Sequence, residues 1–265
     1  MYVLPQQPSS IAKILDASFR LFTAGFGKIV GIGLMLAAFN VGFAYVVDQY
    51  FAMSIPAPAG DAPSAHPEAL THNLPAFFAT LIGFTAFTFI FYGAIISRLD
   101  NLVHQREDSL GAALGIGVRK LPVLILAGIL YGLALAIGSL LLLVPGIILG
   151  LSLSLYPIYI IVENLGGYAS LKASHNLIWG LWWRTLSIYM APGILILIFY
   201  FLLGMIGYGL ADDDASKLGS FGIVDVVTNT LSGLAIPYFY ALAYVVFHDL
   251  KLRKSGDDLA RRLAG

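Results

Sequence analysis

Apolar and polar positions alternate along this chain in long blocks. Six apolar blocks are each long enough to cross a bilayer, at residues 29–50, 76–97, 121–143, 146–162, 185–207 and 223–247. A membrane-spanning helix needs about 20 residues, whereas a buried strand of a soluble protein takes roughly 4–8. The pattern therefore predicts an all-α, polytopic membrane protein in which six transmembrane helices form a single membrane domain over residues 1–265.

The third and fourth blocks are separated only by Val144-Pro145-Gly146. Proline is poorly tolerated inside a helix, and glycine adopts turn conformations easily. We therefore expect Pro145 and Gly146 to form a tight turn between two antiparallel helices. The alternative is one bent helix of about 40 residues, which is too long for a single crossing.

Three further segments have the amphipathic pattern of helices that lie on a membrane surface, at residues 10–27, 109–118 and 167–183. In the first segment one apolar face is expected, made of Ile11, Ile14, Leu15, Phe19, Phe22 and Phe26. Each segment precedes an apolar block, with Lys28, Lys120 or Arg184 at the junction. This order of elements predicts a threefold repeat of surface helix and membrane hairpin.

The charged residues give the orientation of the helices. They make up only 11% of the chain, against about a quarter in soluble domains. The six-helix layout places 14 of the 15 Lys and Arg residues on one side and Lys217 alone on the other. Because cytoplasmic loops collect basic residues, we expect both termini in the cytoplasm, with residues 248–265 as a cytoplasmic tail.

The same charges indicate which partners to expect. The basic segment from Lys251 to Lys254 follows the last apolar block and should attract anionic lipid headgroups. Membrane lipids are therefore the expected partners, with other membrane proteins as a further class. The net charge is zero and there is no basic stripe, so nucleic acid is not expected.

The two outward loops, residues 52–75 and 208–222, are short, polar or rich in proline. We expect them to be irregular and the chain to contain no soluble domain.

Candidate catalytic chemistry is sparse. The chain has no Cys, and its five His residues match no metal-ligand spacing. No arrangement typical of a hydrolase or metalloprotease is visible. We therefore predict no catalytic residue, no metal, no cofactor and no enzymatic activity.

Polar residues inside the spans are the usual markers of function in a membrane protein. Asn40, Tyr156, Tyr159 and Asn229 are candidates to line a polar cavity; the asparagines could instead bond neighbouring helices. Small residues recur at every fourth position of the third and fourth blocks, and we interpret them as close packing between two helices. They are Gly128, Gly132, Ala136, Gly146, Gly150 and Ser154.

Glu163 lies at the cytoplasmic end of the fourth block, where the helix dipole disfavours an acidic side chain. We expect compensation either from the backbone N–H groups at Gly166-Gly167 or from a cation, Lys120 or Arg184. Both readings make Glu163 a structural clamp between the fourth span and the next surface helix. The alternative is a proton-coupling carboxylate.

One stretch resembles a known family. It runs from Val144-Pro145-Gly146-Ile147 through Tyr156-Pro157, Glu163, Ser174 and Gly180 to Trp183-Arg184. The pattern is similar to that of an uncharacterised family of bacterial six-helix inner-membrane proteins, which are related to the membrane domain of glycerophosphodiester phosphodiesterases. The resemblance implies a fold and a location in the bacterial inner membrane. It implies no activity, since the catalytic domain of the phosphodiesterases is a separate soluble unit.

Two functions are compatible with these observations. The first is a non-enzymatic inner-membrane protein in envelope or lipid homeostasis, acting as a scaffold or lipid-handling bundle. The second is a small transporter or permease with a polar cavity in the middle of the membrane. An intramembrane enzyme would need a converging set of acids, bases or metal ligands, which the sequence does not provide.

Overall fold

The computed structural model describes residues 2–51, 67–210 and 221–264, and the regular elements of these residues are all α-helices. They are α1 (Ile11–Phe51), α2 (Pro67–Val103), α3 (Leu110–Leu141), α4 (Leu143–Leu153), α5 (Tyr156–Val162), α6 (Gly167–Ile178), α7 (Trp182–Leu210) and α8 (Ile223–Ala264). Six segments are long and apolar enough to cross a membrane, the fourth being formed by α4 and α5 together. The chain is thus a polytopic helical membrane protein, as the sequence predicts.

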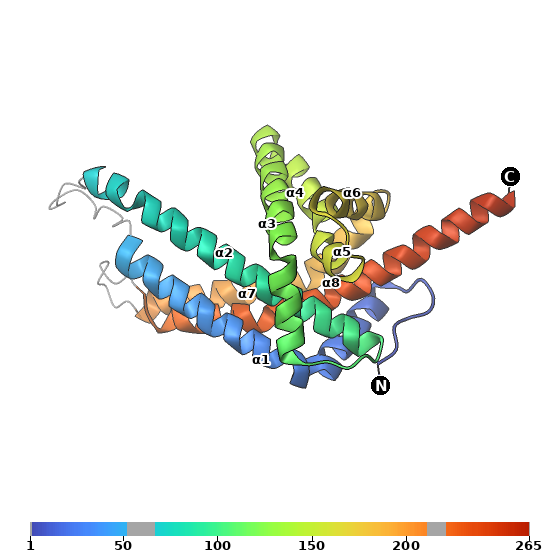
Figure 1. Cartoon of the computed structure of the whole chain (residues 1–265), viewed down its shortest axis with the longest axis horizontal. Helices are drawn as coiled ribbons and strands as arrows, with labels where there is room; N and C mark the ends of the chain where they lie inside the picture. The colour runs from blue at the N-terminus through green and yellow to red at the C-terminus, as the bar shows by residue number, and fades with distance from the viewer. Residues whose placement is uncertain (1, 52–66, 211–220, 265) are drawn as a thin grey trace.

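Helices α1, α2, α7 and α8 run broadly alongside one another, and α3 and α4 leave this group at a steep angle (Figure 1). The closest pair is α1 and α8, because glycines let their backbones touch. A Cβ atom on Gly233 of α8 would lie 2.5 Å from the backbone of Ala37 in α1. Close approach through small residues is the usual way in which helices associate in lipid.

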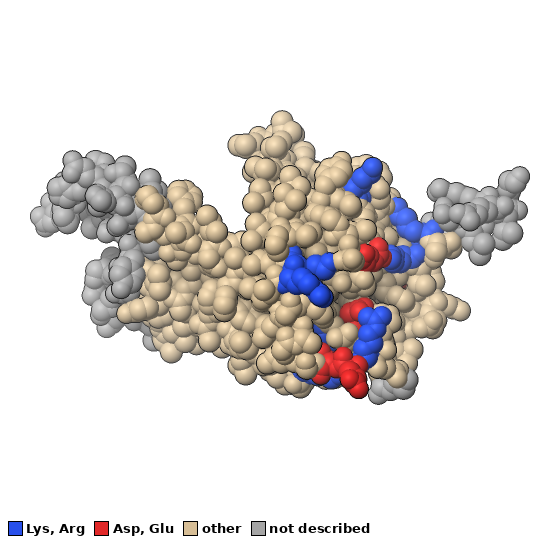
Figure 2. All heavy atoms as spheres, in the orientation of Figure 1, with Lys and Arg blue, Asp and Glu red and all other residues tan. Residues whose placement is uncertain are grey.

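The tightly packed core occupies one half of the molecule. It joins fully buried aliphatic side chains of α1, α2, α5, α6 and α8, among them Ile14, Leu21, Ile95, Leu99, Ile158, Ile178, Val246 and Leu250. We call this half the charged end, because the ion pairs of Arg98, Arg184 and Lys251 lie there. In Figure 2 the charged side chains of the visible face gather around α5, α6 and the start of α3, whereas the outer parts of α1 and α2 show none.

Two of the three expected surface helices are not separate elements. Residues 10–27 continue into the first span as α1, and residues 109–118 continue into the third span as α3. No proline or glycine pair interrupts either junction, and Pro122 is accommodated inside α3. Within the expected apolar face of the first segment, Ile14 is buried against the protein, whereas Phe19 and Phe26 are exposed.

The third expected surface helix, residues 167–183, is a separate but shorter element, α6. It is followed by a turn in which Gly180 has φ +90°, a conformation that favours glycine. Helix α7 then begins at Trp182. This turn redirects the chain from α6 into the fifth span.

The turn between the third and fourth spans lies earlier than Pro145 and Gly146. Leu142 is the residue in extended conformation, and α4 begins at Leu143. Pro145 and Gly146 lie inside the first turn of α4, where a proline costs little because the first N–H groups of a helix have no partner in the helix. Gly146 instead provides close contact, since a Cβ atom there would lie 2.4 Å from Ser139 Oγ of α3.

Two terminal regions also differ from the expectation. Helix α8 continues through residues 248–264, so the expected tail is helical. Helix α2 begins at Pro67 and contains Pro75, so the described part of loop 52–75 is helical as well. The rest of that loop, and most of loop 208–222, lie outside the described residues.

Candidate functional site

The fourth span is interrupted between α4 and α5, and α6 holds the interruption in place. Ser154 and Leu155 lie outside both helices. The buried Ser174 of α6 accepts a hydrogen bond from Leu155 N at 3.1 Å and donates one to the carbonyl oxygen of Ser152 at 2.8 Å. A side chain from a neighbouring helix thereby satisfies backbone groups that the helix break leaves free, which is how broken helices persist in a membrane.

Helices α2 and α3 cross at Gly93 and Gly117 and then diverge. A Cβ atom on Gly117 would lie 2.3 Å from the carbonyl oxygen of Ile90, and one on Gly93 would lie 3.0 Å from the Cα atom of Gly117. Further along α3, the space beside Gly128 is filled by the ring of Phe89 from α2. Beyond this point α3 and α2 separate (Figure 1).

A cavity of about 340 Å³ lies where the two helices separate. Its lining comes from α2, α3, α5 and α8 and from the break in the fourth span, namely Phe89, Tyr92, Gly128, Tyr131, Ser154, Tyr156, Pro157 and Tyr240. The volume falls in the range of small-molecule pockets, about 300–1,000 Å³. The lining combines apolar rings with hydroxyl groups.

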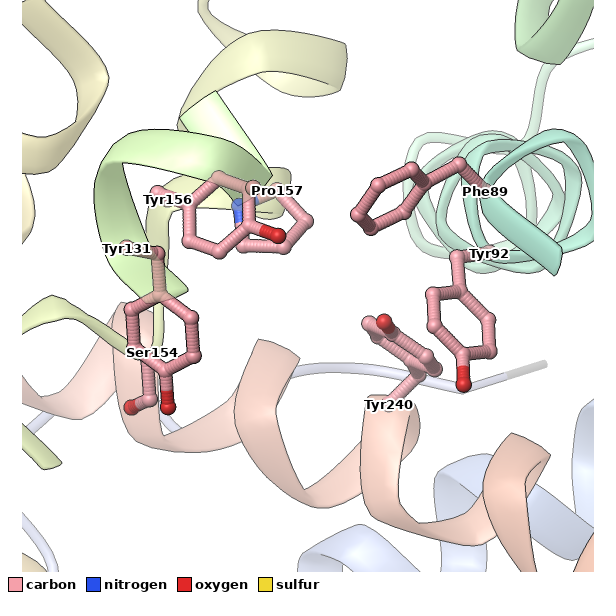
Figure 3. Close-up of a pocket in the computed structure, with 8 residues that line it drawn as sticks. Phe89, Tyr92, Tyr131, Ser154, Tyr156, Pro157 and Tyr240 are labelled. Atoms are coloured by element: carbon pink, nitrogen blue, oxygen red, sulfur yellow. The ribbon is translucent and has the colours of Figure 1, made fainter. Parts of the chain in front are cut away.

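Figure 3 shows how these side chains lie. Tyr131, Tyr156 and Pro157 form one wall, and Phe89 and Tyr92 form the opposite wall, with Tyr240 rising from α8 between them. The hydroxyl groups of Tyr156 and Tyr240 face the open space. The walls are held by ring contacts: Tyr131 and Tyr156 have centroids 5.5 Å apart, and Tyr92 and Tyr240 have centroids 5.0 Å apart.

The cavity is separated from the charged groups that lie on α3 and at the end of α5. Tyr156 precedes Glu163 by seven residues, or about 10 Å along a helix. Tyr131 follows Lys120 by eleven residues, or about 16 Å. These spacings separate the cavity from the charged end, and both are shorter than the roughly 30 Å thickness of a hydrocarbon core.

Uncovered apolar side chains lie on the face of α2 that lines the cavity. Phe78 and Ile82 are exposed and precede the lining residue Phe89 by eleven and seven residues, so the three side chains share one face of the helix. In a membrane, lipid covers such side chains. The lining face of α2 therefore continues along the helix into a surface where acyl chains are the natural solvent.

The structure brings only one of the four expected lining residues to this cavity. Tyr156 lines it, whereas Asn40, Tyr159 and Asn229 do not. Tyr159 packs against Phe247 with centroids 5.0 Å apart, and Asn229 donates to the carbonyl oxygen of Asp225 within its own helix at 2.9 Å. The asparagine of α8 thus satisfies its amide locally.

Tyr92, Tyr131 and Tyr240 were missed because they are far apart in the sequence and belong to three different spans. The signal that could have found them is tyrosine inside an apolar block. A phenol brings a hydroxyl group into the membrane, where it needs a hydrogen-bond partner.

The residues of the expected clamp lie at the charged end but pair differently. Glu163 pairs with Lys251 of α8, and Lys120 donates to the side-chain oxygen of Asn164. Arg184 pairs with Asp249 at 3.2 Å. Neither Lys120 nor Arg184 is the partner of Glu163, so the choice of cations was wrong, and the clamp role of Glu163 stays a prediction.

Asp249 is a buried carboxylate that sequence reasoning overlooked. It accepts hydrogen bonds from Ser9 N at 2.8 Å and from Arg253 at 2.8 Å, in addition to the pair with Arg184. The carbonyl oxygen of Ser9 in turn accepts from Arg184 and Arg253. This network fastens the N-terminal segment to α7 and α8.

The N-terminal segment is further anchored by Tyr2, whose hydroxyl donates to the carbonyl oxygen of Ala17 at 2.9 Å. Burial raises the pKa of Tyr2 to about 12, with the nearby Asp16 carboxylate adding to the shift. The hydroxyl therefore stays protonated, and the hydrogen bond intact, at neutral pH.

Comparison with known protein families, with curated protein sequences and with solved structures gives no match for this chain. The resemblance to the bacterial six-helix family therefore stays a prediction, and the case for a function depends on the geometry described above.

Proposed function

We propose that this protein is a non-enzymatic lipid-handling protein of the bacterial inner membrane, and that its cavity holds part of a lipid molecule. The observation that carries the proposal is the ring-lined cavity of about 340 Å³ at the point where α2 and α3 diverge. A lipid reaches such a cavity sideways from the bilayer.

Three features support this reading. The separation of the cavity from the charged end favours a position inside the membrane, where lipid is the abundant ligand. Exposed apolar side chains of α2, Phe78 and Ile82, share one helix face with its lining residue Phe89. Its lining offers rings and hydroxyl groups, which suit an apolar chain with a few polar atoms. The proposed role is binding, without a chemical step.

Photocrosslinking tests the proposal, because it identifies which peptide of the protein contacts the lipid. The purified protein would be placed in bilayer nanodiscs that contain lipids with a photoreactive group in the acyl chain. We expect crosslinks on the cavity residues Tyr156 and Tyr240 that unlabelled lipid extract competes away at low concentration. The exposed face of α7, for example Leu197, is the control, because bulk lipid covers it without specificity. Equal competition at both places would contradict the proposal.

A small transporter is the second candidate, and the break at Ser154 and Leu155 favours it. Discontinuous helices beside a binding site are common in transporters. A transport path must connect to water on at least one side, whereas a lipid site opens to the bilayer. Because the chain has no native cysteine, Ser154→Cys can be probed alone. Rapid reaction with a charged thiol reagent would favour transport, and protection from it would favour lipid handling.

A further inference from the structure

We propose that the part of the lipid that lies in the cavity carries no charge and has oxygen atoms that form hydrogen bonds with the cavity residues. This inference rests on the proposed function and narrows it to a class of ligand. It excludes the phosphate of a phospholipid headgroup from the cavity.

The first argument concerns the hydroxyl groups. Tyr131 donates to the carbonyl oxygen of Gly150 at 3.2 Å, and Ser154 donates to that of Leu151 at 2.8 Å. The hydroxyl groups of Tyr92, Tyr156 and Tyr240 make no such bond to any residue that the structure describes. A hydroxyl group that faces an apolar cavity or lipid needs a hydrogen-bond partner. The pair that faces the open space, Tyr156 and Tyr240, therefore points to oxygen atoms on a ligand.

The second argument concerns charge. The eight lining residues include no Lys, Arg, His, Asp or Glu. Lys251, Lys120 and Arg98 of the lining helices do not line the cavity and bond Glu163, Asn164 and Asp108 instead. An unpaired phosphate in an apolar site is strongly disfavoured, whereas a neutral ester, hydroxyl or carbonyl group needs only the hydrogen bonds that the tyrosines offer.

The third argument concerns shape. The two walls of aromatic rings are separated by an open space (Figure 3). Such a space accepts an acyl or isoprenoid chain, or a flat ring. Diacylglycerol and isoprenoid quinones share the required chemistry, since both are uncharged, have long apolar chains and carry exposed oxygen atoms.

The experiment compares three photoreactive probes in nanodiscs: diacylglycerol, an isoprenoid quinone, and phosphatidic acid with the same acyl chains as the diacylglycerol. The readout is crosslinking to the peptide that contains Tyr156. We expect at least one neutral probe to label it about tenfold more strongly than phosphatidic acid, a difference of about 1.4 kcal/mol. The neutral probe that labels the peptide more strongly shows whether the ligand is a diacylglycerol or an isoprenoid quinone.

The double variant Tyr156→Phe/Tyr240→Phe tests the role of the hydroxyl groups while keeping both rings. We expect labelling by the preferred neutral probe to fall about tenfold, as the loss of one or two hydrogen bonds predicts. Tyr168→Phe is the matched control, because Tyr168 is exposed on α6 and should have no effect. If the double variant does not fold, the single variant Tyr240→Phe serves with a smaller expected loss.

Two results would overturn the inference while leaving the proposed function standing. One is labelling by phosphatidic acid that equals or exceeds that of both neutral probes. The other is unchanged neutral labelling in a folded Tyr→Phe variant. If no probe labels the Tyr156 peptide more strongly than the peptides of α7, this result contradicts the proposed function itself.

Discussion

Asp249 joins three parts of the chain at the charged end, and its side chain is only 4% exposed. Asp249→Asn removes the negative charge that Arg184 and Arg253 share. The Arg184 and Arg253 side chains are only 20% and 25% exposed, and breaking a fully buried pair costs about 3–5 kcal/mol, so we expect a loss of stability approaching this size in denaturant unfolding in detergent micelles. Asp16→Asn is the matched control, because the pair of Asp16 with Arg20 is exposed on both sides. A similar, small effect of both variants would contradict the role given to Asp249.

Ser174 ties α6 to the break in the fourth span through two hydrogen bonds. Ser174→Ala removes the acceptor of Leu155 N and the donor to the carbonyl oxygen of Ser152. Buried groups left without a partner cost about 1–3 kcal/mol. Thermal unfolding in detergent should show this loss, whereas Ser187→Ala, at an exposed position with one bond inside its own helix, should change little. Equal melting temperatures would argue against the role of Ser174.

The ion-pair partner of a single residue is hard to predict from a sequence. The physical argument for a compensating cation near Glu163 is sound, but Lys251 is 88 residues away on α8. Lys120 and Arg184 were chosen because they are near in the membrane layout, and packing gave each a different partner. With side chains 45% and 28% exposed, the pair of Lys251 and Glu163 should contribute little, since exposed ion pairs contribute about 0–1 kcal/mol.

At the scale of elements, the crossing of α2 and α3 determines where the cavity forms. Gly117→Ala would place a Cβ atom 2.3 Å from the carbonyl oxygen of Ile90, and a backbone atom cannot move aside cheaply. We expect a loss of about 1–3 kcal/mol from overpacking, measured by unfolding in detergent. Gly115→Ala on the same helix meets nothing within 4 Å and should be neutral or gain up to about 1 kcal/mol. A neutral Gly117→Ala would refute the close crossing.

The apolar blocks alone predict the number and order of the spans, because length and hydropathy decide whether a helix can cross a bilayer. Element boundaries were less predictable. Amphipathic and apolar segments merge in α1 and α3, since no residue at Lys28 or Lys120 stops a helix. The break at Ser154 is not marked in the sequence either, because the bonds from Ser174 that stabilise it come from another helix.

For the whole molecule, the distribution of basic residues predicts that the charged end faces the cytoplasm. Because the chain has no cysteine, single cysteines can be placed without changing the background. Cysteines at Ser109 and Ser255 should stay unlabelled by an impermeant thiol reagent in intact cells and react after lysis. A cysteine at Ser64 or Ser216 should react in intact cells. Labelling of Ser109→Cys from outside would contradict the orientation.

The cavity is a property of the whole molecule, which is why the sequence predicts so little of it. Four tyrosines from four helical segments meet there, and only Tyr156 was singled out. Tyr92, Tyr131 and Tyr240 become neighbours only once α2, α3 and α8 are packed. The polarity of a residue in a span did not predict whether it lines the cavity, since the side chain of Asn229 forms its hydrogen bond within its own helix.

The most direct test of the central claim, that the cavity holds a lipid, is to fill it. Ser154→Leu adds an apolar side chain to the lining, while Ser187→Leu makes the same change on the exposed face of α7. Native mass spectrometry of each purified variant measures the lipid that remains bound. We predict that wild type and Ser187→Leu retain lipid and that Ser154→Leu loses most of it with its fold intact. Equal retention by a folded Ser154→Leu variant would contradict the claim.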